Sequence, residues 1–451
     1  MQQKLSNREK YSYGLGALGK DFAYAIVAYY LMVYFTDVVK LNPAFVGNLF
    51  LVARIWDAVN DPAMGMLVDN TRTKYGKFRP WMLVGTILNA IVIILLFRKP
   101  DLEGLPLYIY FSVMYLLWGM TYTVMDIPYW SMLPTLTSNK EEREKVAVIP
   151  RIFASTAWLI LGTFGLQIIN KLGNGDDVVG YANLAVLISC IFIGTIVITV
   201  LNTKEKIEIP TENTKKDKVT FKQTINIIKE NDQLMAFVLI VLCMNLIMQI
   251  SGGVALYYFK YAVGVETLFS FYNGFAGIAE IGGLMLFPVL VTKLGRQNVF
   301  KLGGILPVIG FTLLLVAGIV APTHALFVGS AGFILKFGSG LLLASTTVML
   351  ADVVDYGEFK LGTRNESIVF SVQTLLVKTA SAVSGWLVGV GLSVVGYVPD
   401  VPQSESAIMG IRFLMIGAPI IFAIIMVILY KTKYKLNGEF HNKVLQSLKG
   451  N

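Results

Sequence analysis

Residues 179–201 read VGYANLAVLISCIFIGTIVITVL and contain no charged side chain. A helix that crosses a bilayer needs about 20 apolar residues, so this stretch predicts a membrane span. The whole chain has the same character: 55% of its 451 residues are apolar and 15% are charged, and its mean hydropathy is +0.64. A soluble protein has roughly a quarter charged residues. The composition therefore indicates a polytopic membrane protein and excludes a soluble enzyme, a disordered tail protein and a disulfide scaffold.

Similar apolar runs recur between polar breaks along the chain. They predict twelve helices, near residues 11–37, 44–69, 79–98, 105–134, 146–170, 179–201, 232–262, 267–292, 298–320, 324–354, 366–396 and 406–430. The first ten residues are polar and no cleavage site is evident after them, so we expect an uncleaved first helix rather than a signal peptide. The expected fold is all-α.

The positions of the 38 lysines and arginines predict the orientation in the membrane. If both termini and every even-numbered loop share one side, that side receives 27 of them and the opposite side receives 4. The positive-inside rule then places both termini in the cytoplasm. Because this loop bias explains the net charge of +9, we expect a lipid bilayer, here the inner membrane, and no nucleic acid as partner.

One long polar stretch divides the predicted helices into two sets of six. A Gly-Lys pair at residues 76–77 and a Gly-Arg pair at 295–296 follow the second and the eighth predicted helix, at an offset of 219. This layout favours a transporter with two similar halves around a central site. The expected divisions are an N-terminal half, a cytoplasmic linker, a C-terminal half and a cytoplasmic tail, at residues 1–201, 202–231, 232–430 and 431–451.

Acidic side chains inside predicted spans mark the candidate site. An ionised group at the bilayer centre costs at least about 2.5 kcal/mol, so each needs a partner, a water-filled cavity or a function. With a rise of about 1.5 Å per residue, Asp21 and Asp57 lie near the bilayer midplane, where transporters bind their substrates. The acids deep in the spans are Asp21, Asp57, Asp61, Asp126 and Glu280.

Asp57 and Asp61 are four residues apart and should project from one face of the second helix, near Asn60. Two adjacent carboxylates repel each other unless a cation or a proton lies between them. They are therefore candidate ligands for a metal ion such as Na⁺, to which Thr123 could add a hydroxyl. The alternative is a plain salt bridge between Arg54 and Asp57.

Tyr122, Asp126 and Trp130 lie at intervals of four on the fourth helix. A hydroxyl, a carboxylate and an indole on one face suit a sugar, which needs polar partners for its hydroxyls and a flat apolar surface. The alternative is ordinary helix packing. Other side chains that could complete the site are Lys20, Asp21, Arg151, Gln373, Thr374 and Lys378. Lys378 would be a counter-ion for the acids, and Arg151 could instead anchor its helix at the cytoplasmic interface.

Four segments resemble the melibiose permease family, the glycoside-pentoside-hexuronide:cation symporters of the major facilitator superfamily. They are GALGKDFA (16–23), LFLVARIWDAVNDP (49–62), WGMTYTVMDIPYWS (118–131) and VDYGEFK (354–360). The resemblance implies that the coupling cation binds at Asp57, Asn60, Asp61 and Thr123. It implies that the sugar site is formed by Lys20, Asp21, Tyr122, Asp126, Trp130, Arg151, Gln373, Thr374 and Lys378.

Two positions depart from the family pattern. Leu343 stands where the melibiose carriers have a tryptophan, and Ala28 stands where they have a tyrosine. The resemblance predicts import of a glycoside, an α-galactoside such as melibiose first, together with Na⁺, or with H⁺ or Li⁺. The departures leave a xyloside, a hexuronide or an amphipathic lipid open as the cargo. A membrane-embedded enzyme or receptor is the alternative class, although no nucleophile or metal motif supports an enzyme, and no cofactor beyond the coupling ion is expected.

Glu280 and Lys336 lie at similar depths in the eighth and tenth predicted helices. The 219 offset places Glu280 at the repeat position of Asp61. If the halves are similar, these two helices should be neighbours, and Lys336 should form a buried structural ion pair with Glu280. The alternative is that each side chain faces an aqueous cavity alone.

Overall fold

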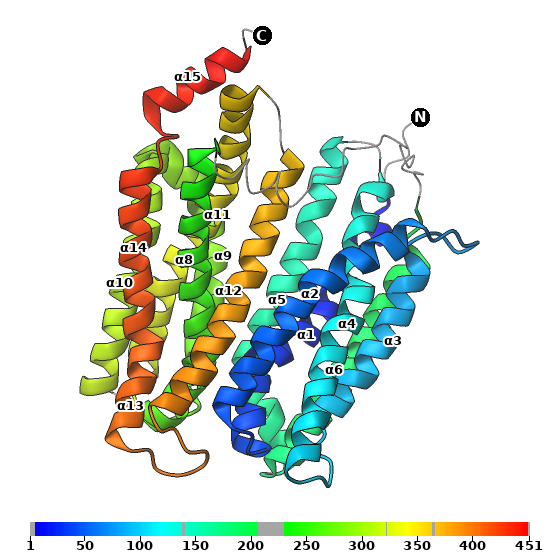
Figure 1. Ribbon diagram of the computed structural model, residues 1–451, viewed down its shortest axis with the longest axis vertical. Coiled ribbons are helices and arrows are strands. Elements are labelled where there is room, and N and C mark those ends of the chain that lie inside the picture. The colour runs from blue at the N-terminus through cyan, green and yellow to red at the C-terminus, as the bar shows by residue number, and fades with distance from the viewer. Residues whose placement is uncertain (1–4, 138–139, 206–229, 322, 363–365, 450–451) are drawn as a thin grey trace. The chain divides into compact units, whose positions relative to one another are not determined.

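The computed structural model of the chain describes residues 5–137, 140–205, 230–321, 323–362 and 366–449, and in these ranges it forms helices and no strands. The chain divides into two compact units. Unit 1 comprises residues 1–211 with 398–401, and unit 2 comprises residues 212–397 with 402–451. In Figure 1, the helices of unit 1 run from blue to green and those of unit 2 from green to red.

The helices of unit 1 are α1 (Asn7–Val33), α2 (Pro43–Asp69), α3 (Arg79–Leu96), α4 (Leu105–Leu136), α5 (Lys140–Gly173) and α6 (Asp177–Asn202). The helices of unit 2 are α8 (Asp232–Tyr257), α9 (Leu268–Leu294), α10 (Arg296–Val320), α11 (Ala325–Leu361), α12 (Glu366–Val394), α13 (Glu405–Arg412), α14 (Ala418–Lys433) and α15 (Gly438–Lys449). Short π-helical turns continue α1, continue α8 and join α13 to α14, at Tyr34–Val38, Tyr258–Val263 and Phe413–Gly417.

These helices overlap the twelve predicted ranges, and one further helix is present. The additional helix is α15, in the segment that the sequence predicted only as a cytoplasmic tail. The two largest boundary differences are the start of α5, at Lys140 instead of residue 146, and the end of α11, at Leu361 instead of near residue 354. The extra turns at the start of α5 and at the end of α11 are polar or charged, and a search for apolar runs leaves them out.

Side-chain caps fix several helix starts. Ser6 and Glu9 form a reciprocal capping box at the start of α1. Asn42 caps α2, with Pro43 at its first position, and Asp176 caps α6. A cap satisfies amide groups that the helix itself leaves without partners, so the helix starts at that residue.

Within the described residues, ten helices are long and apolar enough to cross a membrane, judged by length and composition. Helices α1 and α2 are not among the ten. They carry the predicted site residues Lys20, Asp21, Asp57 and Asp61, whose charges lower the hydropathy of these two helices.

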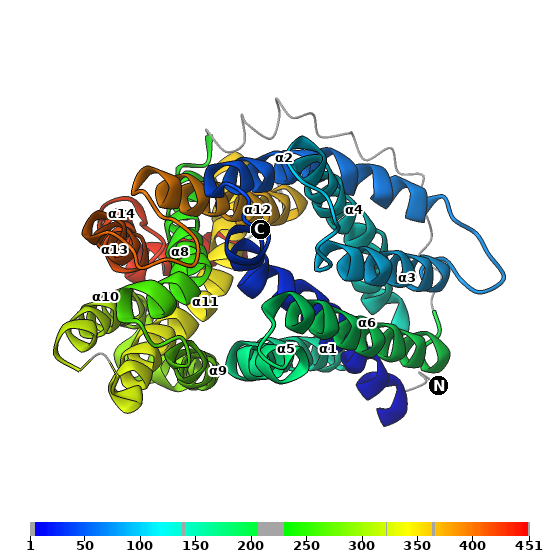
Figure 2. The same cartoon turned by 90° about the horizontal axis from the view of Figure 1, so that it is seen from below.

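The two units repeat the same pattern of helix neighbours. In unit 1, α1 packs on α5 and α6, α4 packs on α2 and α3, and α3 also packs on α6. In unit 2, α8 packs on α12 and α14, α11 packs on α9 and α10, and α10 also packs on α14. Each of these five contacts of unit 1 therefore has a counterpart six predicted helices later. The neighbours of α1 can be followed end-on in Figure 2.

Close packing of α1 on α6 places the next residue of α1, Lys20. A Cβ atom added to Gly19 would lie 1.9 Å from Oγ1 of Thr195 on α6. Only glycine allows this approach without moving the neighbouring helix. The next residue, Lys20, is buried, with 4% of the residue exposed.

Candidate functional site

Lys20 on α1 is the centre of a charged cluster in unit 1. Its Nζ atom lies 2.9 Å from Oδ1 of Asp126 and 3.2 Å from Oδ2 of Asp21. It also donates a hydrogen bond of 3.4 Å to the hydroxyl of Tyr122. One buried ammonium group therefore pairs with two carboxylates, and it gathers three predicted sugar-site residues, Asp21, Tyr122 and Asp126, around itself.

The two ion-paired oxygens are held by charge rather than by well-directed hydrogen bonds. Oδ2 of Asp21 and Oδ1 of Asp126 are buried, and neither accepts a hydrogen bond of good angle from the described residues. A carboxylate oxygen has two lone pairs, so one ion-pair partner leaves it able to accept a further hydrogen bond. Sugar hydroxyls are donors of the required kind.

Aromatic rings surround the ammonium group. Nζ of Lys20 lies 5.8 Å from the ring centre of Tyr122, 5.6 Å from that of Tyr129 and 5.1 Å from that of Trp130. Ring faces attract cations at these distances. The predicted face of Tyr122, Asp126 and Trp130 therefore converges on Lys20.

Helix α5 contributes two further side chains. Arg151 is exposed and places its guanidinium carbon 5.9 Å from the ring centre of Trp130. Seven residues later, Trp158 donates its indole N–H to Oδ1 of Asp21 over 3.1 Å. The sequence analysis singled out Arg151 and missed Trp158. The signal was available, since residues seven apart lie on one face of a helix.

The candidate cation residues lie between α2 and α4. Arg54 donates to Oδ2 of Asp57 over 2.8 Å, and both side chains are largely buried. Thr123 donates to Oδ1 of Asp61 over 3.0 Å. Asp57 thus pairs with Arg54, as the salt-bridge alternative expected, while Asp61 and Thr123 meet as the cation hypothesis expected.

Asn60 adds a detail to this region. Its amide nitrogen is buried and has no hydrogen-bond partner in the part of the chain that the structure describes. The oxygen and nitrogen of an amide are assigned from their partners. With the amide turned over, its oxygen would take this position and could serve a cation. The described residues contain no cluster of three or more His, Cys, Asp or Glu side chains that could hold a metal ion.

The two groups of residues are connected through α4. The guanidinium carbon of Arg54 lies 5.8 Å from the ring centre of Trp118. The ring of Trp118 lies 5.9 Å from that of Tyr122, which accepts the hydrogen bond of Lys20. Neighbouring side chains of unit 1 thus form a continuous series of contacts from Asp57 to Lys20.

The remaining predicted sugar residues belong to α12 of unit 2. Gln373 and Lys378 are half-buried on this helix, and the side chain of Thr374 lies outside the described residues. Of the two positions that depart from the family pattern, Ala28 on α1 and Leu343 on α11 are both exposed.

The sequence profile of a family described as MFS/sugar transport protein matches residues 12–438. The chain belongs to this family. It is 31% identical to the isoprimeverose transporter of Lactiplantibacillus pentosus, over 92% of this chain and 85% of that protein. It is 29% identical to a symporter named YjmB of Bacillus subtilis (strain 168), over 99% of this chain and 96% of that protein.

Among solved structures, the fold resembles that of a bacterial homologue of the human lysosomal transporter Spinster, in an inward-facing and unoccupied conformation. The TM-score is 0.68, with 12% sequence identity, over 96% of this chain and 97% of that one. The family and the fold are those of transporters. The chain is therefore a multi-pass membrane transporter of the MFS/sugar transport family and not an enzyme.

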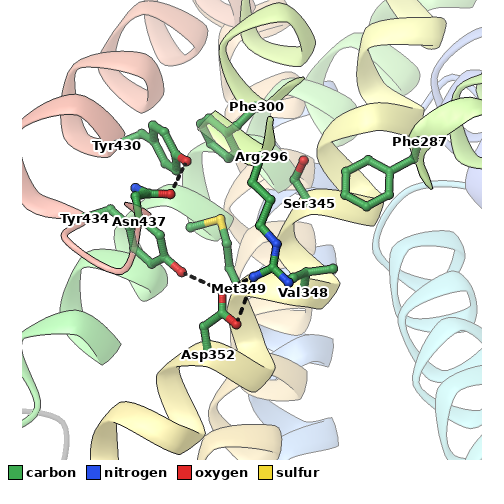
Figure 3. A pocket seen from close by; sticks show the side chains of 10 residues that line it. All are labelled: Phe287, Arg296, Phe300, Ser345, Val348, Met349, Asp352, Tyr430, Tyr434 and Asn437. Atoms are coloured by element: carbon green, nitrogen blue, oxygen red, sulfur yellow. Dashed lines mark hydrogen bonds and ion pairs between the residues drawn. The ribbon is translucent and has the colours of Figure 1, made fainter. Parts of the chain in front are cut away.

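This MFS transporter has a second charged cluster, in unit 2. Arg296 at the start of α10 lies 3.3 Å from Oδ2 of Asp352 on α11, to which Tyr434 also donates (Figure 3). His441 on α15 lies 3.1 Å from the other carboxylate oxygen. The neighbouring cavity has a volume of about 20 Å³, which suits one water molecule and is too small for a sugar.

The predicted pair of Glu280 and Lys336 is confirmed. The two side chains, on the neighbouring helices α9 and α11, approach to 2.9 Å. The burial was predicted too strongly, because 29% of the Glu280 side chain and 25% of the Lys336 side chain are exposed. Water therefore screens part of this interaction.

Proposed function

We propose that this transporter imports a glycoside together with a cation across the inner membrane, with Na⁺ as the first candidate and H⁺ or Li⁺ as alternatives. The observation that carries the proposal is the convergence of Asp21, Asp126 and Tyr122 on Lys20, beside the ring of Trp130. Carboxylates accept from hydroxyls, the ammonium group donates to them, and the indole offers an apolar face. These are the contacts that a sugar ring requires.

The coupling cation would bind at Asp57 and Asp61, with oxygen from Asn60 and Thr123. Thr123 and Asp61 already lie within hydrogen-bond distance, which supports a shared ligand position. Asp57 is paired with Arg54, so an arriving cation would compete with the guanidinium group for this carboxylate. Arg54 lies beside Trp118, and Trp118 lies beside Tyr122. A guanidinium group displaced from Asp57 would therefore alter the surroundings of Tyr122.

Coupling then follows from linkage. If the cation strengthens sugar binding through α4, the sugar must strengthen cation binding by the same factor. Loading of both sites would favour the conformational change of the two halves, as in other transporters with repeated halves. Lys378, Gln373 and Thr374 of α12 would complete the sugar site from the second half.

Three classes of glycoside are candidate substrates. An α-galactoside such as melibiose agrees with the residue types that the chain shares with the melibiose permease family. A xyloside is favoured by the similarity to an isoprimeverose transporter and by the small side chain at Ala28. A hexuronide would use Lys20, Arg151 and Lys378 as additional cations.

Uptake into cells that lack other glycoside carriers tests the proposal. Labelled melibiose, isoprimeverose, lactose and methyl β-glucuronide would be offered with Na⁺, with Li⁺, or with neither ion outside. We expect accumulation of one glycoside that rises at least tenfold with one of the ions. Equal accumulation under all three conditions, in the presence and absence of a proton uncoupler, would contradict cation coupling, and no accumulation of any of these sugars would contradict the substrate class.

A further inference from the structure

Trp158 is a half-buried residue of α5 that the cluster of charges alone does not explain. It lies seven residues after Arg151, so both side chains project from one face of the helix. Its indole N–H donates to Oδ1 of Asp21 over 3.1 Å. This hydrogen bond joins α5 to a carboxylate of α1. An indole has a single N–H group, so the bond to Asp21 uses the whole donor capacity of Trp158.

The hydrogen bond fixes the orientation of Asp21. Oδ1 accepts from Trp158 and Oδ2 is paired with Lys20 at 3.2 Å, so the carboxylate is held at both oxygens. Asp126 is held differently, since among the described residues only its Oδ1 atom has an ion-pair partner. Without Trp158, Asp21 would be free to turn about its side-chain bond toward Lys20 alone.

The ring of Trp158 also continues an aromatic surface. Its centre lies 6.0 Å from the ring centre of Tyr24 and 5.2 Å from that of Tyr29, which it meets edge-on. Tyr24 in turn lies 5.4 Å from Tyr122. Offset and edge-on ring pairs at these distances stabilise one another. The surface therefore runs from Asp21 to the hydroxyl group that Lys20 contacts.

A small side chain follows this aromatic surface along α1. Ala28 lies one helical turn after Tyr24 on α1 and is exposed. Sugars present a flat apolar C–H face as well as hydroxyls, and an aromatic ring covers that face well. Trp158 joins both features in one side chain: it orients a carboxylate and supplies a ring beside it.

We propose that Trp158 determines sugar specificity, because its N–H group aims Asp21 at one hydroxyl and its ring, with that of Tyr24, covers the adjacent C–H face of a pyranoside. The proposal rests on the proposed sugar function. It assigns Trp158 a positioning role through Asp21 and a contact role through its ring, and the two roles can be separated by substitution.

Trp158→Phe keeps a ring and removes the N–H group, whereas Trp158→Ala removes both. The matched control is Trp81→Phe on α3, since Trp81 donates its indole N–H to Thr71 outside the cluster. Binding to the purified transporter would be measured by titration calorimetry with melibiose, isoprimeverose, lactose and methyl β-glucuronide. Monodeoxy derivatives of the tightest-binding sugar would then be titrated, and thermal unfolding would verify the fold of each variant.

We expect Trp158→Phe to bind the parent sugar about tenfold more weakly, which corresponds to the loss of one hydrogen bond to a charged group. One monodeoxy derivative should bind this variant and the unsubstituted protein equally, because it lacks the hydroxyl that Asp21 accepts from. Trp158→Ala should weaken binding of every derivative further, and Trp81→Phe should change none.

Two results would overturn the proposal: unchanged affinities in Trp158→Phe, or an equal loss for the parent sugar and all of its deoxy derivatives. The second result would mark Trp158 as a structural residue only. Failure of the unsubstituted protein to bind any of the four sugars would overturn the proposed function itself and the role of Trp158 with it. These outcomes are distinguished by whether the unsubstituted protein binds.

Discussion

Asp126 and Asp21 share one ammonium group, but they differ in how many of their oxygens are engaged. Trp158 and Lys20 hold both oxygens of Asp21, whereas the described residues engage one oxygen of Asp126. A carboxylate that keeps a lone pair available is the better acceptor for a sugar hydroxyl. At the scale of single residues, we therefore expect Asp126 to be the primary acceptor of the proposed sugar and Asp21 the oriented one.

Asp126→Asn tests this distinction. The amide keeps the size of the side chain but loses its charge, so the hydrogen bond to a sugar hydroxyl weakens and Lys20 loses one of its two counter-charges. A hydrogen bond to a charged group contributes about 1.5 to 3 kcal/mol, and we expect sugar affinity to fall by at least tenfold. Titration calorimetry would measure it. Sugar affinity within twofold of the unsubstituted protein would remove Asp126 from the site.

Asp57→Cys tests the candidate cation site. Asp57 pairs with Arg54 and is 6% exposed, so its loss removes a proposed cation ligand and leaves the guanidinium group without its carboxylate. We expect cation-driven accumulation to be abolished while sugar binding stays measurable. Thr123→Ala, which removes only a hydroxyl, should weaken the response to the cation without abolishing it. Sugar binding that still strengthens with added Na⁺ in Asp57→Cys would contradict the assignment.

The sequence could predict the α4 face, because Tyr122, Asp126 and Trp130 follow one another at the helical repeat. It could not predict that Lys20 would pair with Asp126, because that pair depends on how α1 and α4 lie in three dimensions. Trp158 was missed because an aromatic residue in an apolar span resembles ordinary core, and only its distance to Asp21 reveals a polar role.

At the scale of helices, apolar length predicted the twelve ranges well, since a span must cover the bilayer. It failed at polar ends. Helix α15 was missed because its twelve residues are largely polar. Its contacts are tertiary: His441 lies 3.1 Å from Asp352, Phe440 lies beside Tyr356, and Val444 is fully buried. Such contacts are not visible in a single helix's own sequence.

His441→Ala tests how α15 is held. The substitution removes the imidazole that meets Asp352 at 3.1 Å, while Arg296 and Tyr434 still contact that carboxylate. We expect faster amide hydrogen exchange in α15 and little change in α10 or α11, with a loss of about 1 kcal/mol in local stability. Lys443→Ala, on an exposed position of the same helix, is the control. Unchanged exchange in α15 would show that Phe440 and Val444 hold the helix without His441.

Substitutions of Glu280 and Lys336 test the contact between α9 and α11. Removing one partner of a buried pair typically costs about 3 to 5 kcal/mol, and partial exposure here should reduce that to about 1 to 3 kcal/mol. We expect Glu280→Gln and Lys336→Met each to lower the thermal unfolding midpoint, and the double variant to lose less than the sum. Strictly additive losses would mean that the pair contributes no interaction of its own.

At the scale of the whole molecule, the two units share one plan of helix neighbours, which agrees with the offset between the Gly-Lys and Gly-Arg loops. Yet the units carry different chemistry at equivalent places. Asp61 of α2 meets the hydroxyl of Thr123, while Glu280, at the repeat position, meets the fixed cation Lys336. The equivalent acids of the two units therefore contact different groups, a hydroxyl in unit 1 and an ammonium group in unit 2.

The orientation of this plan in the membrane gives the last prediction. The lysine and arginine bias places both termini in the cytoplasm, so residue 435 should face the cytoplasm and residue 99, in a loop of opposite parity, should face outward. Both lysines are exposed. In a background with Cys190→Ser and Cys243→Ser, Lys99→Cys should react with a membrane-impermeant maleimide in intact cells. Lys435→Cys should react only after permeabilisation, and labelling in the reverse pattern would contradict the predicted topology.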